Sequence, residues 1–223
     1  MIDVDSSIRS SNKFLHEYGL LLNAGMGSSF KASSDFLRIS RSGANYKEIY
    51  DSGIQGIEYN FLINDGSFFQ FSKNDQGLRY AYYPTPYNYD SNHKGVRTLI
   101  ELMSEGEFKD QEIDQLVSEY EYTLDIPFIR YDLSYDDYCE RFHPAAHLHV
   151  GLFVENRWPV KRVLTPFSFL LKILSIYYIE WWSKLNDESE DLLIKKYILE
   201  VSNCPRIDNN YFKESESGRF YIT

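Results

Sequence analysis

Residues 56–83 read GIEYNFLINDGSFFQFSKNDQGLRYAYY, and this stretch decides the fold class. Three runs rich in aromatic and β-branched residues are separated by two turns, Asn64-Asp65-Gly66 and Asn74-Asp75-Gln76-Gly77. An Asp-Gly pair between apolar runs is a strong signal for a β-hairpin. The stretch therefore predicts an antiparallel meander with strands at 56–63, 67–72 and 78–83.

The rest of the chain adds strands and groups of helices. Further strands are expected at 36–40, 121–133, 146–153 and 219–222. Helices are expected at 5–23, 45–52, 93–103, 110–120, 134–142, 165–185 and 187–201. Two of these helices have clear start signals, Ser134 followed by acidic residues and Thr165 followed by proline. Strands in runs with helices grouped elsewhere predict an α+β fold, a curved antiparallel sheet with helices packed on one face. No linker is visible, so we expect one domain, 1–223.

The chain is acidic and contains few cysteines. It has 33 Asp and Glu against 23 Lys and Arg in 223 residues, a net charge of −10. That balance argues against a protein that coats nucleic acid in general, although it leaves room for a local basic cleft. Two distant cysteines and an acidic N-terminus predict a cytoplasmic protein without a signal peptide. The most apolar run, 167–182, contains charged residues and is too short for a membrane span, so we expect a core helix and no membrane contact.

Polar residues on two of the predicted strands form the strongest chemical signal. His147 and His149 are two positions apart on a strand, so their side chains point to one face. Arg130 and Asp132 share a face of the preceding strand in the same way. The intervening connection is short enough for the two strands to be antiparallel neighbours. We therefore expect these four side chains to converge, with His143 approaching from the loop.

Such a cluster supports two chemistries and one structural alternative. His143, His147 and His149, with Asp132 nearby, are suitable ligands for zinc or manganese. Without a metal, His147 and His149 can act as acid and base while Arg130 binds a phosphate and Asp132 orients a histidine. That set suits cleavage of RNA, in which the 2′-hydroxyl is the nucleophile. Alternatively, the histidines fill a polar corner of the sheet and Arg130 and Asp132 form an ordinary ion pair.

The central block also resembles a known family. Arg130-Tyr131-Asp132, the run from His143 to Gly151, Arg157-Trp158-Pro159 and the helix start at Pro166-Phe167 are similar to an uncharacterised bacterial family, domain of unknown function 2290. The same layout resembles, more loosely, the small toxins of bacterial toxin–antitoxin pairs. That second resemblance implies a nuclease-like toxin or an anti-phage defence component. The helices expected at 93–120 are additional relative to those toxins.

Two functions follow as hypotheses. The first is a histidine-dependent phosphodiesterase or ribonuclease-like protein that acts on RNA or another phosphodiester through His147, His149, Asp132 and Arg130. A metallohydrolase with a small-molecule substrate would use the same residues. The alternative is a non-enzymatic acidic subunit that docks on a partner protein from a neighbouring gene, with a tyrosine-rich edge at 80–89 as the contact.

Overall fold

The computed structural model describes residues 2–87, 126–152, 155–188 and 192–218. Its centre is a seven-stranded sheet in which the spatial order of the strands equals their order in the sequence. Every neighbouring pair is antiparallel. The strands are β1 (Leu21–Ala24), β2 (Phe61–Ile63), β3 (Phe68–Asn74), β4 (Gly77–Tyr83), β5 (Ile129–Ser134), β6 (Ala146–Val150) and β7 (Trp158–Pro159). The predicted meander is confirmed and extends across the whole sheet, although the strand predicted at 56–63 begins only at Phe61. The α+β class is also confirmed.

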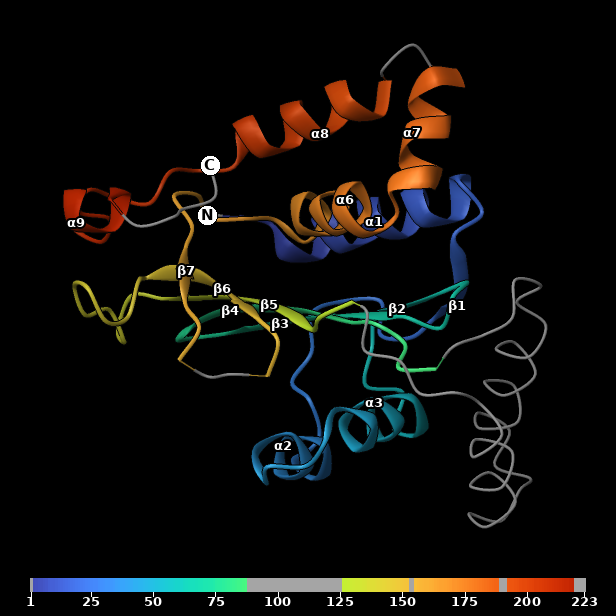
Figure 1. The fold of residues 1–223 in the computed structure, drawn as a ribbon, viewed down its shortest axis with the longest axis horizontal. Helices are drawn as coiled ribbons and strands as arrows, with labels where there is room; N and C mark the ends of the chain where they lie inside the picture. Colours follow the sequence, from blue (N-terminus) through green and yellow to red (C-terminus); the bar gives the residue numbers. More distant parts are fainter. Residues whose placement is uncertain (1, 88–125, 153–154, 189–191, 219–223) are drawn as a thin grey trace.

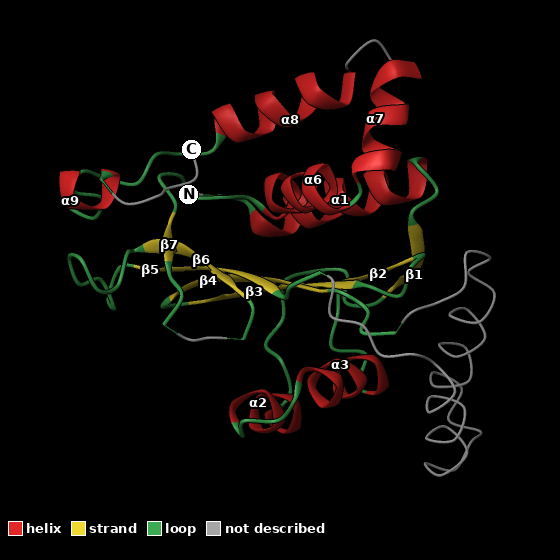
Figure 2. Ribbon diagram, viewed as in Figure 1, coloured by secondary structure: helices red, strands yellow, loops and turns green. Residues whose placement is uncertain are grey.

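Helices cover the sheet on both sides (Figure 1 and Figure 2). The described helices are α1 (Val4–Glu17), α2 (Ser34–Arg41), α3 (Tyr46–Gln55), α6 (Pro166–Tyr177), α7 (Ile179–Glu188), α8 (Leu192–Asn203) and α9 (Glu214–Ser217). α1 and α6 lie against one face, with α7 and α8 packed on α6. α2 and α3 lie below the opposite face. The sequence predicted helices on one face, and this second pair is an addition to that expectation.

The period of two along each strand divides the side chains between two cores. On β5, Ile129, Tyr131 and Leu133 enter the core beneath α1 and α6. The larger core is mainly aromatic, and Phe169 of α6 makes edge contacts with Phe69 and Phe71. The second core lies over α2 and α3 and includes Phe68, Tyr83, Phe36, Tyr50 and Phe128. Arg130 and Asp132 point to the side of this second core.

The long helix predicted at 165–185 is two helices. α6 begins as expected, with Thr165 as N-cap in a capping box and proline at the first position. It ends at Tyr177, and the backbone of the C-cap residue Tyr178 leaves helical geometry. The Tyr178 hydroxyl donates a hydrogen bond to the Asp65 carboxylate at 2.6 Å and lies 2.9 Å from the Tyr82 hydroxyl. These tertiary contacts, which the local sequence does not reveal, accompany the break.

Three local predictions were wrong. Residues 36–40 belong to helix α2, where the Ser33 side chain accepts from the Phe36 amide as an N-cap. Leu21 and Leu22, expected in the first helix, belong to strand β1, which pairs with β2 and follows a left-handed Gly19. Residues 134–142 form turns instead of a helix. There the backbone folds back so that Cys139 bridges His143, with a positive φ of 74° at Arg141 between them.

Of the remaining predicted elements, some are confirmed and others lie outside the residues that the structure describes. The helix at 45–52 is confirmed as α3, and the strand at 146–153 as the shorter β6. The helix at 187–201 is α8, which begins later than predicted. The helices predicted at 93–103 and 110–120, the strand at 219–222 and residues 121–125 lie outside the described residues. Within the described part of the chain, no helix combines the length and the apolar character that crossing a membrane requires.

Candidate functional site

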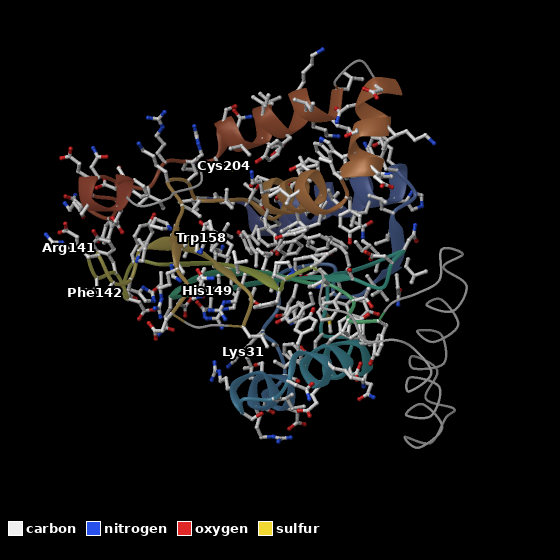
Figure 3. The ribbon with its side chains drawn as sticks, viewed as in Figure 1. Lys31, Arg141, Phe142, His149, Trp158 and Cys204 are labelled. Atoms are coloured by element: carbon white, nitrogen blue, oxygen red, sulfur yellow. The ribbon has the colours of Figure 1, made fainter. Side chains whose placement is uncertain are left out.

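The sheet face that carries α2 and α3 has an apolar half and a polar half. Cross-strand pairing aligns Gln70, Ala81, Arg130 and His149 in one row. The next row consists of Ser72, Arg79, Asp132 and His147. Because paired residues share a face, the polar side chains of four strands meet in one patch. Figure 3 shows His149 on this side of the sheet, with Lys31 farther out toward α2.

The predicted convergence of two strands is confirmed. In the antiparallel β5–β6 pair, Arg130 lies opposite His149 and Asp132 opposite His147. The two imidazoles are buried, with 1% exposure for His147 and 3% for His149. Their Nε2 atoms lie 3.0 Å apart, and the His147 Nδ1 is 2.8 Å from the Pro144 carbonyl oxygen. A carbonyl oxygen can only accept, so Nδ1 donates this hydrogen bond, and the Nε2 of the neutral His147 ring carries a lone pair that faces His149.

Asp132 connects the histidines to two arginines. Its Oδ1 accepts from the Arg79 Nε at 3.0 Å, and its Oδ2 lies 2.8 Å from the Arg130 Nη2. The same Oδ2 is 3.5 Å from the His149 Nε2. The carboxylate therefore has an arginine on either side and a histidine ring in front of it, and these contacts fix its orientation.

Burial and charge shift two pKa values in this cluster. Burial lowers the pKa of His147 from its ordinary 6.5 to about 4, against the attraction of the Asp132 carboxylate. Burial acts to raise the pKa of Asp132, but the His149 hydrogen bond and the charges of Arg130 and Arg79 outweigh it and hold that pKa well below 3.8. At neutral pH the site therefore holds a neutral His147 beside an ionised carboxylate.

His143 lies at the rim of this cluster. Its ring centroid is 4.9 Å from that of His147, in an edge-to-face arrangement. Burial lowers the pKa of His143, so the ring is neutral at physiological pH. The ligating atoms of Asp132, His147 and His149 lie within 4.8 Å of one another, and His143 is not a member of that group. The sequence grouped His143 with His147 and His149 as a metal ligand, whereas the geometry supplies Asp132 as the third donor.

A basic cavity of about 500 Å³ opens over the polar half-face. Within the described residues, six of the chain's 23 Lys and Arg line it, against two of its 33 Asp and Glu. The basic residues are Lys31, Arg41, Lys73, Arg79, Arg130 and Arg157. The acidic residues are Asp132 and Asp137. His143 and His149 also line the cavity. An acidic chain thus carries a local excess of positive charge where its histidines lie, and such an excess attracts anions.

The sequence alone did not predict several of these cavity residues. Arg79 lies 53 positions from its partner Asp132, and Lys31 and Arg41 come from around α2, which was predicted as a strand. An alternation of polar side chains on β3 and β4, at Gln70, Ser72 and Arg79, is the signal that could have indicated a polar half-face. Arg162, close to Arg157 in the sequence, does not line the cavity, and its guanidinium donates to the carbonyl of Cys204.

The tyrosine edge expected at 80–89 is mostly core. Tyr80, Tyr82, Tyr83 and Tyr87 are between 0% and 6% exposed. Tyr82 and Tyr83 alternate between the two cores, and the Tyr87 hydroxyl donates to Asp51. Tyr89 lies outside the described residues. The described part of this segment therefore offers no aromatic contact surface, and its tyrosine content reflects packing on both faces of the sheet.

The fold and the site together define a mixed α+β protein with an Asp, His and Arg cluster at the base of a basic cavity. The chain belongs to the family of uncharacterized conserved proteins described as DUF2290, whose model matches residues 25–216. The match includes the cluster and the six basic residues of the cavity. No curated protein and no solved structure matches the chain, so neither supplies an activity for this fold. The looser resemblance to small toxins has no counterpart among these comparisons.

Proposed function

We propose that the protein cleaves phosphodiester bonds in RNA at the cavity over β4, β5 and β6. The observation that carries this proposal is the coincidence of the histidine cluster with the basic cavity of an acidic protein. Neutralisation of phosphates by Lys and Arg supplies much of the affinity for nucleic acid. Six basic side chains around one opening suit several consecutive phosphates better than a single small anion.

The residues divide into those that bind and those that transfer protons. Arg79 is half-exposed and its Nε is held by Asp132, which leaves its terminal nitrogens for a phosphate. Arg157 also lines the cavity; its Nη1 donates to the Glu155 carboxylate, and its buried Nε has no partner among the described residues. His143 and His149 line the cavity, whereas His147 lies behind His149 and orients its ring. His143, neutral and partly exposed, is the group best placed to take a proton.

The proposed reaction is a transesterification. The 2′-oxygen forms a bond to phosphorus while the bond from phosphorus to the 5′-oxygen breaks. The 2′-hydroxyl loses its proton to a neutral imidazole, and a second protonated group gives a proton to the leaving 5′-oxygen. Arg79 and Arg130 stabilise the charge that develops on the phosphate oxygens. The products are a 2′,3′-cyclic phosphate and a 5′-hydroxyl.

The test uses a mixed-sequence single-stranded RNA pool and the purified protein. We expect cleavage by the wild type, and a rate at least about 100-fold lower for His149→Ala, the loss typical of acid–base groups. The exposed His16 on α1 supplies the matched control, and His16→Ala is expected to cleave at the wild-type rate. A folded wild type that cleaves no RNA in the pool would refute the proposal.

Binding is measured separately, by fluorescence anisotropy with the inactive His149→Ala variant. We expect Arg157→Ala in that background to weaken binding and to reduce the salt dependence by about 0.7, the contribution of one phosphate contact on a single strand. Arg9, exposed on α1, is the matched control, and Arg9→Ala should leave both quantities unchanged. A DNA pool of the same length tests whether the 2′-hydroxyl is needed.

A toxin or anti-phage role in the cytoplasm is the setting that we propose for this activity. Expression of the wild type should then arrest bacterial growth, and His149→Ala should not. If both proteins leave growth unchanged, the setting is wrong even where cleavage is observed in vitro. The alternative function, a non-enzymatic subunit that docks on a partner protein, loses Tyr87 as a contact because that residue is buried. Complex formation that survives His149→Ala, without any cleavage, would favour this alternative.

A further inference from the structure

We infer that Asp132, His147 and His149 form a site for one divalent cation of the zinc or manganese type. This inference rests on the proposed function for the role of the ion, because it names a cofactor for the same cavity. Binding of the ion can nevertheless be measured without any substrate. Three atoms would supply the lone pairs that bind the ion: the Nε2 atoms of His147 and His149 and the Oδ2 of Asp132.

Two of the distances between these atoms are close to those of a coordination shell. Zinc binds nitrogen and oxygen ligands at about 2.0–2.2 Å, so neighbouring ligands of a tetrahedral ion lie about 3.3–3.5 Å apart. The His147 and His149 Nε2 atoms are 3.0 Å apart, and the His149 Nε2 is 3.5 Å from the Asp132 Oδ2. All three atoms lie within 4.8 Å of one another. Small movements of the side chains would place them around one ion.

The groups behind the three atoms hold them in this arrangement. The His147 Nδ1 donates to the Pro144 carbonyl, which leaves its Nε2 as the acceptor. Asp132 is fixed from the other side by Arg79 and Arg130. Outer hydrogen bonds of this kind commonly orient metal ligands and set the histidine tautomer. His147 and His149 also lie on a strand in the middle of the sheet, so their backbone positions are fixed by pairing on both sides.

A proton is the alternative occupant of the space between the histidines. His149 then donates its Nε2 proton to His147, and its Nδ1 becomes a buried acceptor without a partner among the described residues. An ion bound to Nε2 would instead leave the proton on Nδ1, so this atom lacks a partner with either occupant and does not distinguish them. A cation accepts all three lone pairs at once, and the remaining coordination positions can face the cavity, which both Asp132 and His149 line.

The ion would have a direct role in the proposed reaction. Two neutral imidazoles and one carboxylate leave a divalent ion with a net positive charge, and the surrounding arginines add to it. A phosphate oxygen is a suitable ligand for the open positions, and an ion bound there acts as a Lewis acid. His143 lies beside this position and outside the three-atom group, which keeps it available for proton transfer.

The test is isothermal titration of untagged, chelator-treated protein with Zn²⁺ and, separately, with Mn²⁺. We expect one ion per chain for at least one of the two metals. Asp132→Asn and His149→Ala should each weaken binding at least about 100-fold, the upper range found for loss of outer-sphere partners alone. His16→Ala and His143→Ala are the controls and should retain wild-type affinity. Circular dichroism and urea unfolding establish that each variant is folded.

Co²⁺ provides a second readout that a merely structural cluster would not give. When bound by two imidazoles and a carboxylate, it should show visible absorption bands that disappear in His149→Ala. If Asp132→Asn fails to fold, the spectrum of His147→Asn, which can retain the hydrogen bond to Pro144, takes its place. Absence of any bound ion in the folded wild type, or binding retained in folded His149→Ala, would overturn the inference.

The inference and the proposed function can fail separately. If the protein binds no ion and still cleaves RNA in the presence of a chelator, the metal site is refuted and the proposed nuclease activity stands. If the wild type binds one ion, His149→Ala binds none and the wild type cleaves no RNA, the metal site stands and the proposed nuclease activity is refuted.

Discussion

The pH dependence of stability offers a direct test of the buried histidine pair. We consider His147→Asn in chelator-treated protein, so that no ion competes with protons. The asparagine amide can replace the Nδ1 hydrogen bond to the Pro144 carbonyl but cannot be protonated. The comparison therefore isolates the titration of one imidazole from the other groups that titrate in the same pH range.

The direction and the size of the change in unfolding free energy with pH follow from the pKa of His147, which burial lowers from 6.5 to about 4. Below pH 6.5 the His147 imidazole becomes protonated in the unfolded chain, whereas in the folded protein it stays neutral until the pH approaches about 4. Stability from this residue is therefore complete above pH 6.5 and is lost as the pH falls towards 4. The full loss is about 3 kcal/mol, and the loss between pH 7.5 and pH 5.5 is about 1.4 kcal/mol.

The assay is urea unfolding followed by tryptophan fluorescence at pH 7.5 and at pH 5.5, above the pI near 5.0. The wild type should lose about 1.4 kcal/mol more than His147→Asn between these two values. The absolute stability of the variant is not the readout, because the substitution also removes packing contacts. An equal loss in both proteins would show that His147 is as easily protonated in the folded state as in the unfolded state, and would refute the reasoning.

Two further predictions concern the strands that hold the site, both measured by urea unfolding. A Cβ at Gly77 would lie 1.8 Å from the Leu133 carbonyl oxygen at the β4–β5 junction, so Gly77→Ala should cost about 2–3 kcal/mol of stability. Gly27→Ala is the control, because a Cβ there meets nothing within 4 Å, and it should change stability by less than about 0.5 kcal/mol. Equal effects of the two substitutions would contradict the proposed clash. Tyr131→Phe should cost about 1–3 kcal/mol of stability, because the buried hydroxyl donates to the Arg162 carbonyl and accepts from the Leu164 amide. The half-exposed Tyr135 supplies the control. If Tyr131→Phe costs no more stability than Tyr135→Phe, the two hydrogen bonds of the Tyr131 hydroxyl do not stabilise the fold.

The sequence predicted the site best where the period of two along a strand determines which face of the sheet each side chain occupies. The alternation at 129–133 and 146–150 placed Arg130, Asp132, His147 and His149 on one face, and the short connection made the strands neighbours. Both inferences depend only on local geometry. Arg79 was missed because its place beside Asp132 depends on β4 lying next to β5, a pairing of residues 53 positions apart. Lys31 and Arg41 were missed because the segment at 36–40 fits a short strand and a helix equally well, and the Ser33 N-cap decides between them.

The failed helix at 134–142 has a different cause. Ser134 and the acidic residues after it are a genuine helix start signal, and the Ser134 hydroxyl does accept from the Asp137 amide. The chain nevertheless turns back at Arg141, and Cys139 pairs with His143. β6 must begin at Ala146 to place its histidines opposite β5, which leaves too few residues for a helix and a return. Tertiary pairing therefore overrode a local preference, and it also brought His143 to the rim of the cavity.

The same alternation that builds the core also makes the site rigid. Each strand that supplies a polar group to the cavity supplies core residues from its other face: Tyr131 and Leu133 flank Asp132, and Leu148 lies between His147 and His149. Catalytic and metal-binding groups on paired strands are held more precisely than groups on loops. Any function of this cluster should therefore depend on preformed geometry, with His143, which comes from the preceding turn, as the member freest to move.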